Sequence, residues 1–400
     1  MVPTLGAIIV TRLLGSANLA GLATSTLGVS RFLVSYPVGK VADLYGRKVA
    51  VVLGLLLGLV GAVGTGLSIL WSSFAFFVAS IVVFGAGVTA GYQLRVAAAD
   101  MYPPSRRGQG LGYVLTGSLV GTLGGPVLIM AAQVWSGPLG LDPIALAWLL
   151  VPAIVVPGIV LVLFVRPDPK EIAAHLEEYY PEYIPSRDQW GDDDARTGPL
   201  RFLRDRPKQV AFVASFAAQG NMSMMMALTP LALEHHGHTV PSISVAVAIH
   251  VMGMFGFSLP LGRLADTAGR RAVLLLGLLL AAVGTILVPL TSHYWAIVTG
   301  IFLIGVGWSA VTVAATAVIA DTTRPVERGR AVGTNDTVGA ASAVLLPLIA
   351  GPVVETLGLA SLGILGVGLV VPPLILLLTR LTEMSPGKYG EEHFPTSTLG

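Results

Sequence analysis

The sequence contains no cysteine and few charged residues, and both absences narrow the classes of function. Without cysteine the chain has no disulfide, no thiolate metal ligand and no thiol nucleophile. Charged residues make up only 12% of the 400 residues, with a formal net charge of +2. No cleavable signal peptide is evident at the N-terminus. Disulfide-stabilised folds and cysteine-dependent chemistry are therefore excluded.

What the chain has instead is apolar sequence. Hydrophobic residues make up 54% of it, the mean hydropathy is +0.78, and the apolar residues come in stretches of about twenty. A helix needs ~20 apolar residues to cross the hydrocarbon layer of a membrane. The 48 glycines and 26 prolines fit this interpretation, because small residues let membrane helices approach closely and proline breaks are tolerated there. The composition predicts a membrane protein with many transmembrane helices.

Lysine and arginine are distributed unevenly among the connections between the apolar stretches. Of the 24 lysines and arginines, 21 lie in the tails or in every second connection, and these segments all fall on the same side of the membrane. By the positive-inside rule this side is cytoplasmic, together with both termini and the central linker, in a plasma or bacterial inner membrane. The basic residues therefore indicate topology and not nucleic-acid binding. The connections without lysine or arginine, which should face outward, are 70–73, 133–145, 231–240, 291–295 and 353–358.

The apolar stretches predict a series of transmembrane helices with short connections. The expected spans are 17–38, 49–69, 74–98, 109–132, 146–165, 208–231, 241–261, 272–291, 296–319, 331–352 and 357–380.

The sequence repeats itself once. GKVADLYGRK at 39–48 returns as GRLADTAGRR at 262–271, an offset of 223, and ADMYPPSRRGQGLG at 99–112 aligns with ADTTRPVERGRAVG at 320–333, an offset of 221. Two nearly equal offsets predict two homologous halves, each built from six helices.

The repeat divides the chain into four parts. In the second half, the first helix is expected to begin at residue 208, ahead of Gly262. The same spacing counted back from Gly39 places the start of the first helix before Met1, so we expect only its outer end, MVPTLGAIIV. The linker is charged and contains prolines, and we expect one surface helix near 170–179. The expected parts are an N-terminal bundle at 1–165, a cytoplasmic linker at 166–207, a C-terminal bundle at 208–382 and a cytoplasmic tail at 383–400.

The pattern G-x-x-x-D-x-x-G-R-[RK] occurs in both halves and resembles the loop signature of the major facilitator superfamily. The resemblance implies an all-α membrane protein with two pseudo-symmetric six-helix bundles, in which this motif closes the cytoplasmic side. Glycine permits a close helix crossing, and aspartate can cap a helix and pair with arginine. The alternative is that the basic residues only anchor the topology. The residues of this gate motif are Gly39, Asp43, Gly46, Arg47, Gly262, Asp266, Gly269 and Arg270.

The span 109–132 carries Gly112, Gly121, Gly125 and Pro126. This set resembles the glycine–proline motif of drug:proton antiporters, but Ile129 and Met130 replace the two trailing glycines of that motif. The arginine usual in the preceding helix of those antiporters is also absent from SIVVFGAG at 80–87. We therefore favour helix packing and bending as the role of these glycines.

Methionine is concentrated in one place, because residues 221–226 read NMSMMM. Met222 and Met226 are four residues apart and share a helix face, and His250 and Met254 repeat that spacing in the next span. If both faces turn inward, they form a descending series of neutral, soft ligands that suits Cu(I). The alternatives are a flexible methionine-rich gate for an organic substrate and ordinary packing.

The M-x3-M and H-x3-M pair resembles the CcoA-like branch of the superfamily, which includes bacterial copper importers. Met222, Met226, His250 and Met254 match the four metal-handling positions of that branch. The same branch also includes riboflavin importers that share the four residues, so the motif leaves the substrate open between copper and riboflavin.

Further candidates lie outside this motif. His235, His236 and His238 in an outward connection could capture an ion, although histidines in a short loop more often serve no ligand. Charged or amide side chains inside the membrane are functional candidates because burying a charge in hydrocarbon costs ~2.5–3.5 kcal/mol or more. These are Arg31, Arg95, Asn221, Asn335 and Asp336. Asp336 is the candidate proton-coupling carboxylate, paired with Arg31 or Arg95, and a salt bridge that does not titrate is the alternative.

The sequence predicts a monomeric secondary-active transporter that works by alternating access. Copper import is the first hypothesis, with copper as transported substrate and no resident cofactor. Uptake of riboflavin or another small organic solute is the second, and drug export the third. A non-transporting membrane receptor remains open. An enzyme is not expected, because no nucleophile, metal-bound water or cofactor constellation appears.

Overall fold

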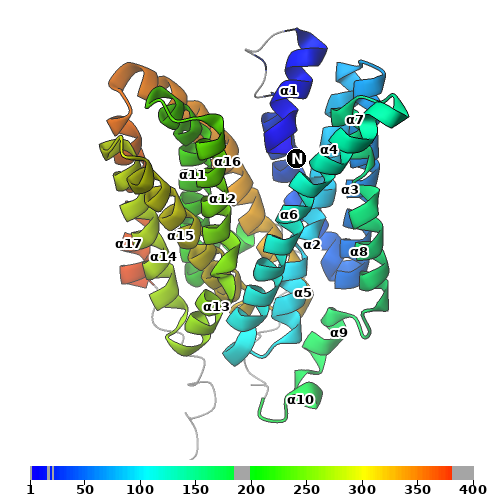
Figure 1. The fold of residues 1–400 in the computed structure, drawn as a ribbon. Coiled ribbons are helices and arrows are strands. Elements are labelled where there is room, and N and C mark those ends of the chain that lie inside the picture. The colour runs from blue at the N-terminus through cyan, green and yellow to red at the C-terminus, as the bar shows by residue number, and fades with distance from the viewer. Residues whose placement is uncertain (1, 16–18, 20–21, 184–198, 381–400) are drawn as a thin grey trace, which may run out of the picture.

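The computed structural model describes residues 2–15, 19, 22–183 and 199–380, and these residues form helices and turns without a β-strand. The long helices stand side by side in two groups, α1 to α8 in one and α11 to α17 in the other (Figure 1). The short helices α9 and α10 lie below the first group. The prediction of an all-α fold is confirmed.

The helices of the first half follow the predicted spans with two interruptions. The predicted span 74–98 is broken at Tyr92 and Gln93, and the span 146–165 is broken before Pro152. Proline disfavours a helical residue before it and lacks the N–H that a helix needs. The helices are α1 (Val2–Leu14), α2 (Leu22–Tyr45), α3 (Arg47–Leu70), α4 (Phe74–Gly91), α5 (Leu94–Met101), α6 (Arg107–Leu139), α7 (Pro143–Leu149) and α8 (Pro152–Phe164).

The second half repeats this organisation, and its helix α12 ends at Gly256 before a short turn leads into α13. The short 3-10 helix η5 (Pro325–Glu327) precedes α16, as η2 (Pro104–Arg106) precedes α6. The helices are α11 (Arg206–His235), α12 (Val240–Gly256), α13 (Ser258–Thr267), α14 (Arg270–Leu287), α15 (Tyr294–Asp321), α16 (Arg328–Leu357) and α17 (Ala360–Arg380).

Between the halves the linker forms two short helices, where the sequence predicts one. They are α9 (Pro169–Ala174) and α10 (Leu176–Tyr179), and His175 separates them. Ala173 and Leu176 are buried, and α9 packs against α5, so this part of the linker is docked on the first half. The C-terminal tail 383–400 and linker residues 184–198 lie outside the described residues.

The gate motif lies mostly within helices, which corrects the predicted boundaries. The sequence predicts that the second span ends at residue 38, whereas α2 continues to Tyr45 and α3 begins at Arg47. The chain reverses at Gly46, which has φ +102°, and its counterpart Gly269 has φ +94°. Side chains disfavour this region of backbone conformation, so the turn itself requires glycine at both positions.

Ten helical segments of the described chain are long and apolar enough to cross a membrane. The set does not include α1, which has 13 residues, or α2, which carries Arg31, Lys40 and Asp43. Within the molecule α2 packs along α4 and α16. An α-helix of many charged or polar residues is tolerated in a membrane when they face protein or a cavity.

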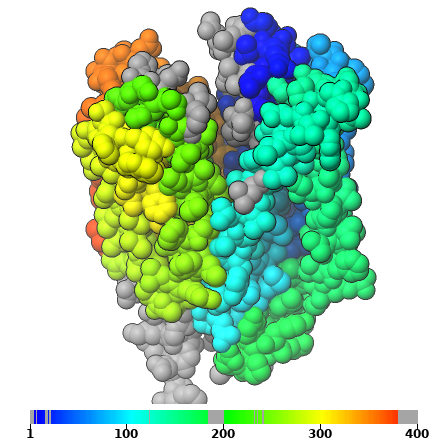
Figure 2. Space-filling view, in the orientation of Figure 1, coloured from blue at the N-terminus to red at the C-terminus, as the bar shows by residue number. Residues whose placement is uncertain are grey.

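The two halves meet at one end and part at the other. The closed end carries Arg47, Arg107, Arg270 and Arg328, and we call it the basic end. There α2 packs along α16, and α6 packs along α13. Figure 2 shows the halves in contact toward this end and separated by a cleft at the opposite end. The structure is therefore open on the side that the positive-inside rule assigns to the outside.

Glycines set the distance between the halves at the basic end. A Cβ on Gly39 of α2 would collide with the carbonyl oxygen of Gly329 on α16, and a Cβ on Gly262 of α13 would collide with that of Gly108 on α6. The backbones therefore touch at two equivalent crossings. This is the close approach that glycine permits between helices.

The glycines of the span 109–132 divide between packing and open space. A Cβ on Gly112 would lie 2.7 Å from Leu259 Cα on α13, so Gly112 belongs to the contact between the halves. At Gly121 nothing lies within 4 Å of that position. Helix α6 also continues through Pro126. Gly112 thus has the packing role that the sequence favoured over an antiporter motif.

Candidate functional site

The first gate joins α2 of one half to the start of α16 in the other. Asp43 accepts hydrogen bonds from the backbone nitrogens of Gly329 (2.8 Å) and Arg330 (2.9 Å). Its carboxylate is buried, and it also pairs with Arg47 at 2.6 Å. A carboxylate at the start of a helix satisfies free N–H groups and the positive end of the helix dipole. Asp43 is thus a helix cap supplied across the interface between the halves.

Arg47 extends the first gate into a network of buried charges. Its Nε donates to Asp100 at 2.6 Å, and one terminal nitrogen donates to the carbonyl oxygen of Pro325 at 2.7 Å. Asp100 also pairs with Arg328, which in turn donates to the carbonyl oxygen of Ala320. Asp100 therefore joins an arginine from each half. Asp100 is thus an ion-pair centre between the halves.

The second gate repeats the first with the halves exchanged. Asp266 of α13 accepts from the backbone nitrogens of Gly108 (2.8 Å) and Gln109 (2.7 Å) at the start of α6. Arg270 pairs with Asp266 at 2.6 Å and with Asp321 at 3.2 Å. Asp321 also pairs with Arg107. Each contact lies 221 or 223 residues from its counterpart in the first gate, as the repeat requires.

The gates have a physical consequence for motion. Four arginines, Asp43 and Asp100 are buried here, and the side chains of Asp266 and Asp321 are 8% and 14% exposed. Buried charges are costly unless each one keeps its partner. If the halves separate at this end, Asp43 and Asp266 lose the helix termini that they cap in the other half. The contacts thus stabilise one conformation, which is closed at the basic end.

The linker contributes to the first gate. Asp168 accepts from the backbone nitrogens of Arg47 (3.1 Å) and Lys48 (3.0 Å), and it caps α9 through Lys170 N at 2.8 Å. Lys170 Nζ donates to the carbonyl oxygen of Asp43. Helix α9 also contacts η5 of the second half. The first gate is therefore covered by a helix that touches both halves.

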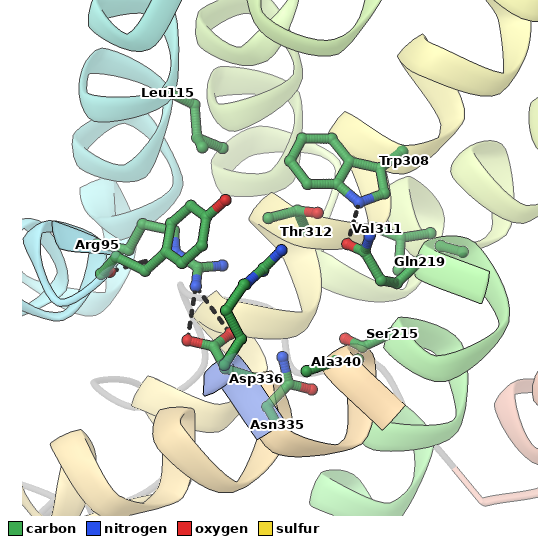
Figure 3. Close-up of a pocket in the computed structure, with 14 residues that line it drawn as sticks. Arg95, Leu115, Ser215, Gln219, Trp308, Val311, Thr312, Asn335, Asp336 and Ala340 are labelled. Carbon is green, nitrogen blue, oxygen red and sulfur yellow. Dashed lines mark hydrogen bonds and ion pairs between the residues drawn. The ribbon is translucent and has the colours of Figure 1, made fainter. Parts of the chain in front are cut away.

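A cavity lies between the halves, with a volume of about 50 Å³. Both halves contribute to its wall (Figure 3). The volume is room for a few water molecules or one small polar group. The lining residues that carry polar or aromatic groups are Arg31, Tyr92, Arg95, Ser215, Gln219, Trp308, Thr312, Asn335 and Asp336.

An ion pair crosses this cavity. One terminal nitrogen of Arg95, on α5, lies 2.8 Å from each carboxylate oxygen of Asp336, on α16 (Figure 3). Both side chains are about nine-tenths buried. The partner of Asp336 is thus Arg95 and not Arg31. Because the two helices belong to different halves, this pair links the halves at the cavity.

The opposite wall of the cavity is organised around an indole. Trp308 Nε1 on α15 donates to Gln219 Oε1 on α11 at 2.9 Å, and Gln219 Nε2 donates to Ser223 Oγ at 3.3 Å. Figure 3 shows Trp308 and Gln219 facing each other across from Arg95. The hydrogen bonds fix the Gln219 amide, and the Trp308 ring offers an apolar surface toward the space.

The methionines of α11 occupy two environments. Met224 and Met225 are buried in the core of the second half. Met222 and Met226 are half-buried and follow Ser215 and Gln219 at intervals of three or four residues, which places them on the helix face that lines the cavity. They are not themselves among the lining residues.

His250 is directed toward a neighbouring helix. Its Nδ1 donates to the carbonyl oxygen of Ile301 on α15 at 2.6 Å, and the residue is 2% exposed. Because a carbonyl can only accept, the proton of the neutral ring is on Nδ1 and Nε2 carries the lone pair. Met254, half-buried, stands 223 residues after Arg31 and so occupies the repeat position of a cavity residue.

The remaining candidates are spread over the molecule. Asn221 lies in the core of the second half, where Nδ2 donates to Thr285 Oγ1 at 2.7 Å. His236 is exposed, and His238 packs on the Tyr294 ring at 5.1 Å. The side chain of His235 lies outside the described part of the structure. Among described residues no three His, Asp or Glu side chains are grouped to hold a metal ion.

Sequence reasoning missed five of the polar and aromatic lining residues, Tyr92, Ser215, Gln219, Trp308 and Thr312. A helical projection of 208–231 could have placed Gln219 with Ser215 and Met222 on one face. No local pattern marks Tyr92, because its position depends on the break between α4 and α5.

The arrangement of two repeated halves around a cavity can be compared with known proteins. The sequence model of the Major Facilitator Superfamily matches residues 1–208 and 210–399. The chain belongs to this superfamily. Its members are transporters and not enzymes, and the chain is accordingly a multi-pass membrane transporter.

Relatives cover nearly the full length of the chain. The uncharacterised MFS-type transporter YddS of Bacillus subtilis (strain 168) is 27% identical over 95% of this chain and 87% of its own. The riboflavin transporter RfnT of Brucella anthropi is 26% identical over 94% of this chain and 91% of its own. The proton:xylose symporter XylE is similar in fold, with a TM-score of 0.72 at 12% identity, over 96% of this chain and 91% of XylE.

Proposed function

We propose that the protein imports a small organic solute through the central cavity by alternating access. The observation that carries the proposal is a polar and aromatic cavity, lined by both halves, that two gates seal at the basic end while the opposite end is open. A site at the interface of two homologous halves is exposed to each side in turn when the halves rock.

The chemistry of the wall favours an organic solute. The lining offers guanidinium, amide and hydroxyl groups together with the Trp308 and Tyr92 rings. Few polar groups within an aromatic wall are typical of sites for small molecules. The cavity has room for a small polar head group, and the body of the solute can extend into the open cleft. The similarity to a riboflavin transporter makes riboflavin the first solute to test.

We further propose that Asp336 couples transport to protons. While Asp336 is ionised, its pair with Arg95 links α5 to α16. Protonation removes the charge that Arg95 binds and so weakens this link between the halves. Proton binding and rearrangement of the halves are then connected through one carboxylate.

Copper import is the second candidate function, and it rests on His250. Because His250 Nδ1 donates to the carbonyl oxygen of Ile301, Nε2 is available to a ligand. This arrangement is usual for metal-binding histidines. Met254 follows one turn later on the same helix. Thioether and neutral imidazole would suit Cu(I).

The experiment measures riboflavin and Cu(I) accumulation in proteoliposomes that contain the full chain. We expect riboflavin accumulation that a proton gradient increases, and a loss of that increase in Asp336→Asn. His250→Ala and Met254→Ala should leave riboflavin uptake largely unchanged. Copper accumulation that these two variants abolish, without riboflavin uptake, would replace the first proposal by the second.

A further inference from the structure

Arg31 is half-buried, and it differs from the buried arginines of the described chain. Arg47, Arg95, Arg270 and Arg328 each pair with a carboxylate within the protein. Within the described ranges no carboxylate lies within ion-pair distance of Arg31, although its side chain lines the cavity. Its guanidinium carbon lies 4.9 Å from the centroid of the Tyr92 ring. A cation–π contact compensates only part of the cost of placing a charge in a membrane.

The charges of the cavity wall do not cancel. Arg31 and Arg95 are positive, and Asp336 is the one acidic residue in the lining. Because Arg95 and Asp336 neutralise each other at 2.8 Å, one positive charge remains. A site with an excess charge and low-dielectric walls attracts ligands of the opposite sign.

A second polar group of the wall also lacks a partner. Asn335 lines the cavity next to Asp336, is 5% exposed, and its Oδ1 has no hydrogen-bond partner among the residues described. Buried polar atoms are nearly always satisfied by protein, water or ligand. Figure 3 shows the Asn335 side chain beside Asp336 at the floor of the space. This oxygen accepts hydrogen bonds, so a donor group of a ligand, and not its carboxylate, would satisfy it, whereas the Arg31 guanidinium offers donors to an anion.

The shape of the space selects the size of that group. A volume of about 50 Å³ has room for a small polar group such as a carboxylate. Apolar surface in the lining comes from Leu115, Val311 and the Trp308 ring, which suits the apolar body of a solute. A carboxylate is also the planar group that a guanidinium binds through two hydrogen bonds.

We propose that Arg31 is the specificity-determining residue of the cavity and recognises the carboxylate of a small organic acid with an apolar or aromatic body. This inference rests on the proposed transport of an organic solute and names its chemical class. Arg31 then has its anion in the ligand, whereas the buried arginines have theirs in the protein.

Two pairs of probes with the same body test the charge. They are indole-3-acetate with indole-3-acetamide, and phenylacetate with phenylacetamide. Affinities are measured by thermal-shift titration of the detergent-solubilised full chain. We expect both carboxylates to stabilise the wild type and to bind about tenfold or more tightly than their amides, since a charge-assisted hydrogen bond contributes roughly that much.

Variants assign the effect to Arg31. Arg31→Gln should reduce carboxylate affinity about tenfold or more and leave the amides unchanged, and Arg31→Lys should retain part of the preference. Arg12→Gln is the matched control, because Arg12 forms an exposed ion pair with Asp142 at 2.9 Å outside this cavity. The thermal midpoint without ligand reports whether each variant is folded.

Three outcomes would overturn the inference: neither carboxylate stabilises the wild type, the amides bind as tightly as the acids, or Arg31→Gln keeps the preference. The proposed function fails separately. If riboflavin and other neutral solutes are transported while the carboxylates bind no more tightly than their amides, the proposal of solute transport stands and the proposed role of Arg31 is wrong. If no organic solute of either charge is transported or bound, both are wrong.

Discussion

The two gates are built from equivalent residues, yet the described part of the linker covers only the first. Asp43, Arg47 and Asp100 repeat as Asp266, Arg270 and Asp321, with the same partners in exchanged halves. Only the first gate receives Asp168, which binds two backbone nitrogens at the start of α3. At Gly269, the equivalent turn, the structure shows open space around the Cβ position.

The comparison distinguishes the charge networks, which hold the basic end closed, from the linker contact, which changes the stability of the closed state. The aspartate–arginine pairs named above are symmetric, so either gate alone can hold two helices of opposite halves together. The first gate has one further pair, in which the Arg330 side chain lies 3.1 Å from Asp43 where the second gate has Gln109. The linker contact is asymmetric and so can alter only one gate. We expect the symmetric parts to have the larger effects, and the following predictions run from large to small.

The largest effect is expected on removing an ion-pair centre. Asp100→Ala leaves buried Arg328 without a carboxylate and Arg47 with Asp43 alone. Asp321→Ala does the same to Arg107 and Arg270. Breaking a buried pair in this way costs ~3–5 kcal/mol. Both variants should open the basic end and reduce uptake strongly and equally. Since the chain has no cysteine, Ser215→Cys in the cavity supplies a single reporter for labelling from the basic side. A large effect of one variant and none of the other would show that the gates are not equivalent.

A smaller but still large effect is expected at the helix crossings. Gly39→Ala and Gly262→Ala place a methyl group against a backbone carbonyl of the other half, and overpacking of this kind costs ~1–3 kcal/mol. Labelling of the cavity from the basic side should rise in both variants. Gly117→Ala on α6 is the matched control, because nothing lies within 4 Å of its Cβ position. If Gly117→Ala has the same effect, helix propensity and not the crossing is responsible.

Removing the linker contact should have a moderate effect on one gate only. Asp168→Ala deletes the carboxylate that caps both α3 and α9, and loss of a cap costs ~0.5–2 kcal/mol. We expect uptake to change by a few-fold and labelling from the basic side to increase less than in Asp100→Ala. In a protein that already carries Asp100→Ala, the effect of Asp168→Ala should be smaller, because both changes act on the first gate. In a protein that carries Asp321→Ala, the effects of the two changes should be additive. Equal addition in both backgrounds would contradict an action through the first gate.

The smallest effect is expected at the surface of the linker. Glu182→Ala removes an ion pair with Arg106 at 3.3 Å, in which both side chains are more than half exposed. Exposed pairs contribute ~0–1 kcal/mol. Uptake and labelling should therefore match those of the wild type. A change as large as that of Asp168→Ala would mean that docking of the whole linker matters, and not the Asp168 cap.

The sequence anticipated much of the gate and less of the cavity. Gly39, Asp43 and Arg47 could be assigned because the motif occurs twice at the repeat spacing. The roles of Asp100 and Asp321 could not, because each binds arginines from both halves and no local pattern records such a pairing. The partner of Asp336 required the structure for the same reason, since Arg95 lies 241 residues away.

The methionine cluster shows a further limit of sequence patterns. Met222, Met224, Met225 and Met226 are neighbours in the chain, but helix geometry sends two of them into the core and two toward the cavity side. His250 has the spacing of a ligand to Met254, yet its ring is held by Ile301 on another helix. Spacing identifies a face of a helix, and only packing decides what that face contacts.

The sequence by itself determined the membrane-spanning helices, the two repeated halves and the residues of the gate motif, because hydropathy, charge placement and glycine turns are local properties of the chain. Only the tertiary structure decided which charges neutralise each other and which remain free. Arg95 and Arg31 look alike in sequence, but α16 brings Asp336 to one of them and leaves the other facing the cavity. The cost of a buried charge depends on its neighbours in space, and these come from helices far apart in the chain.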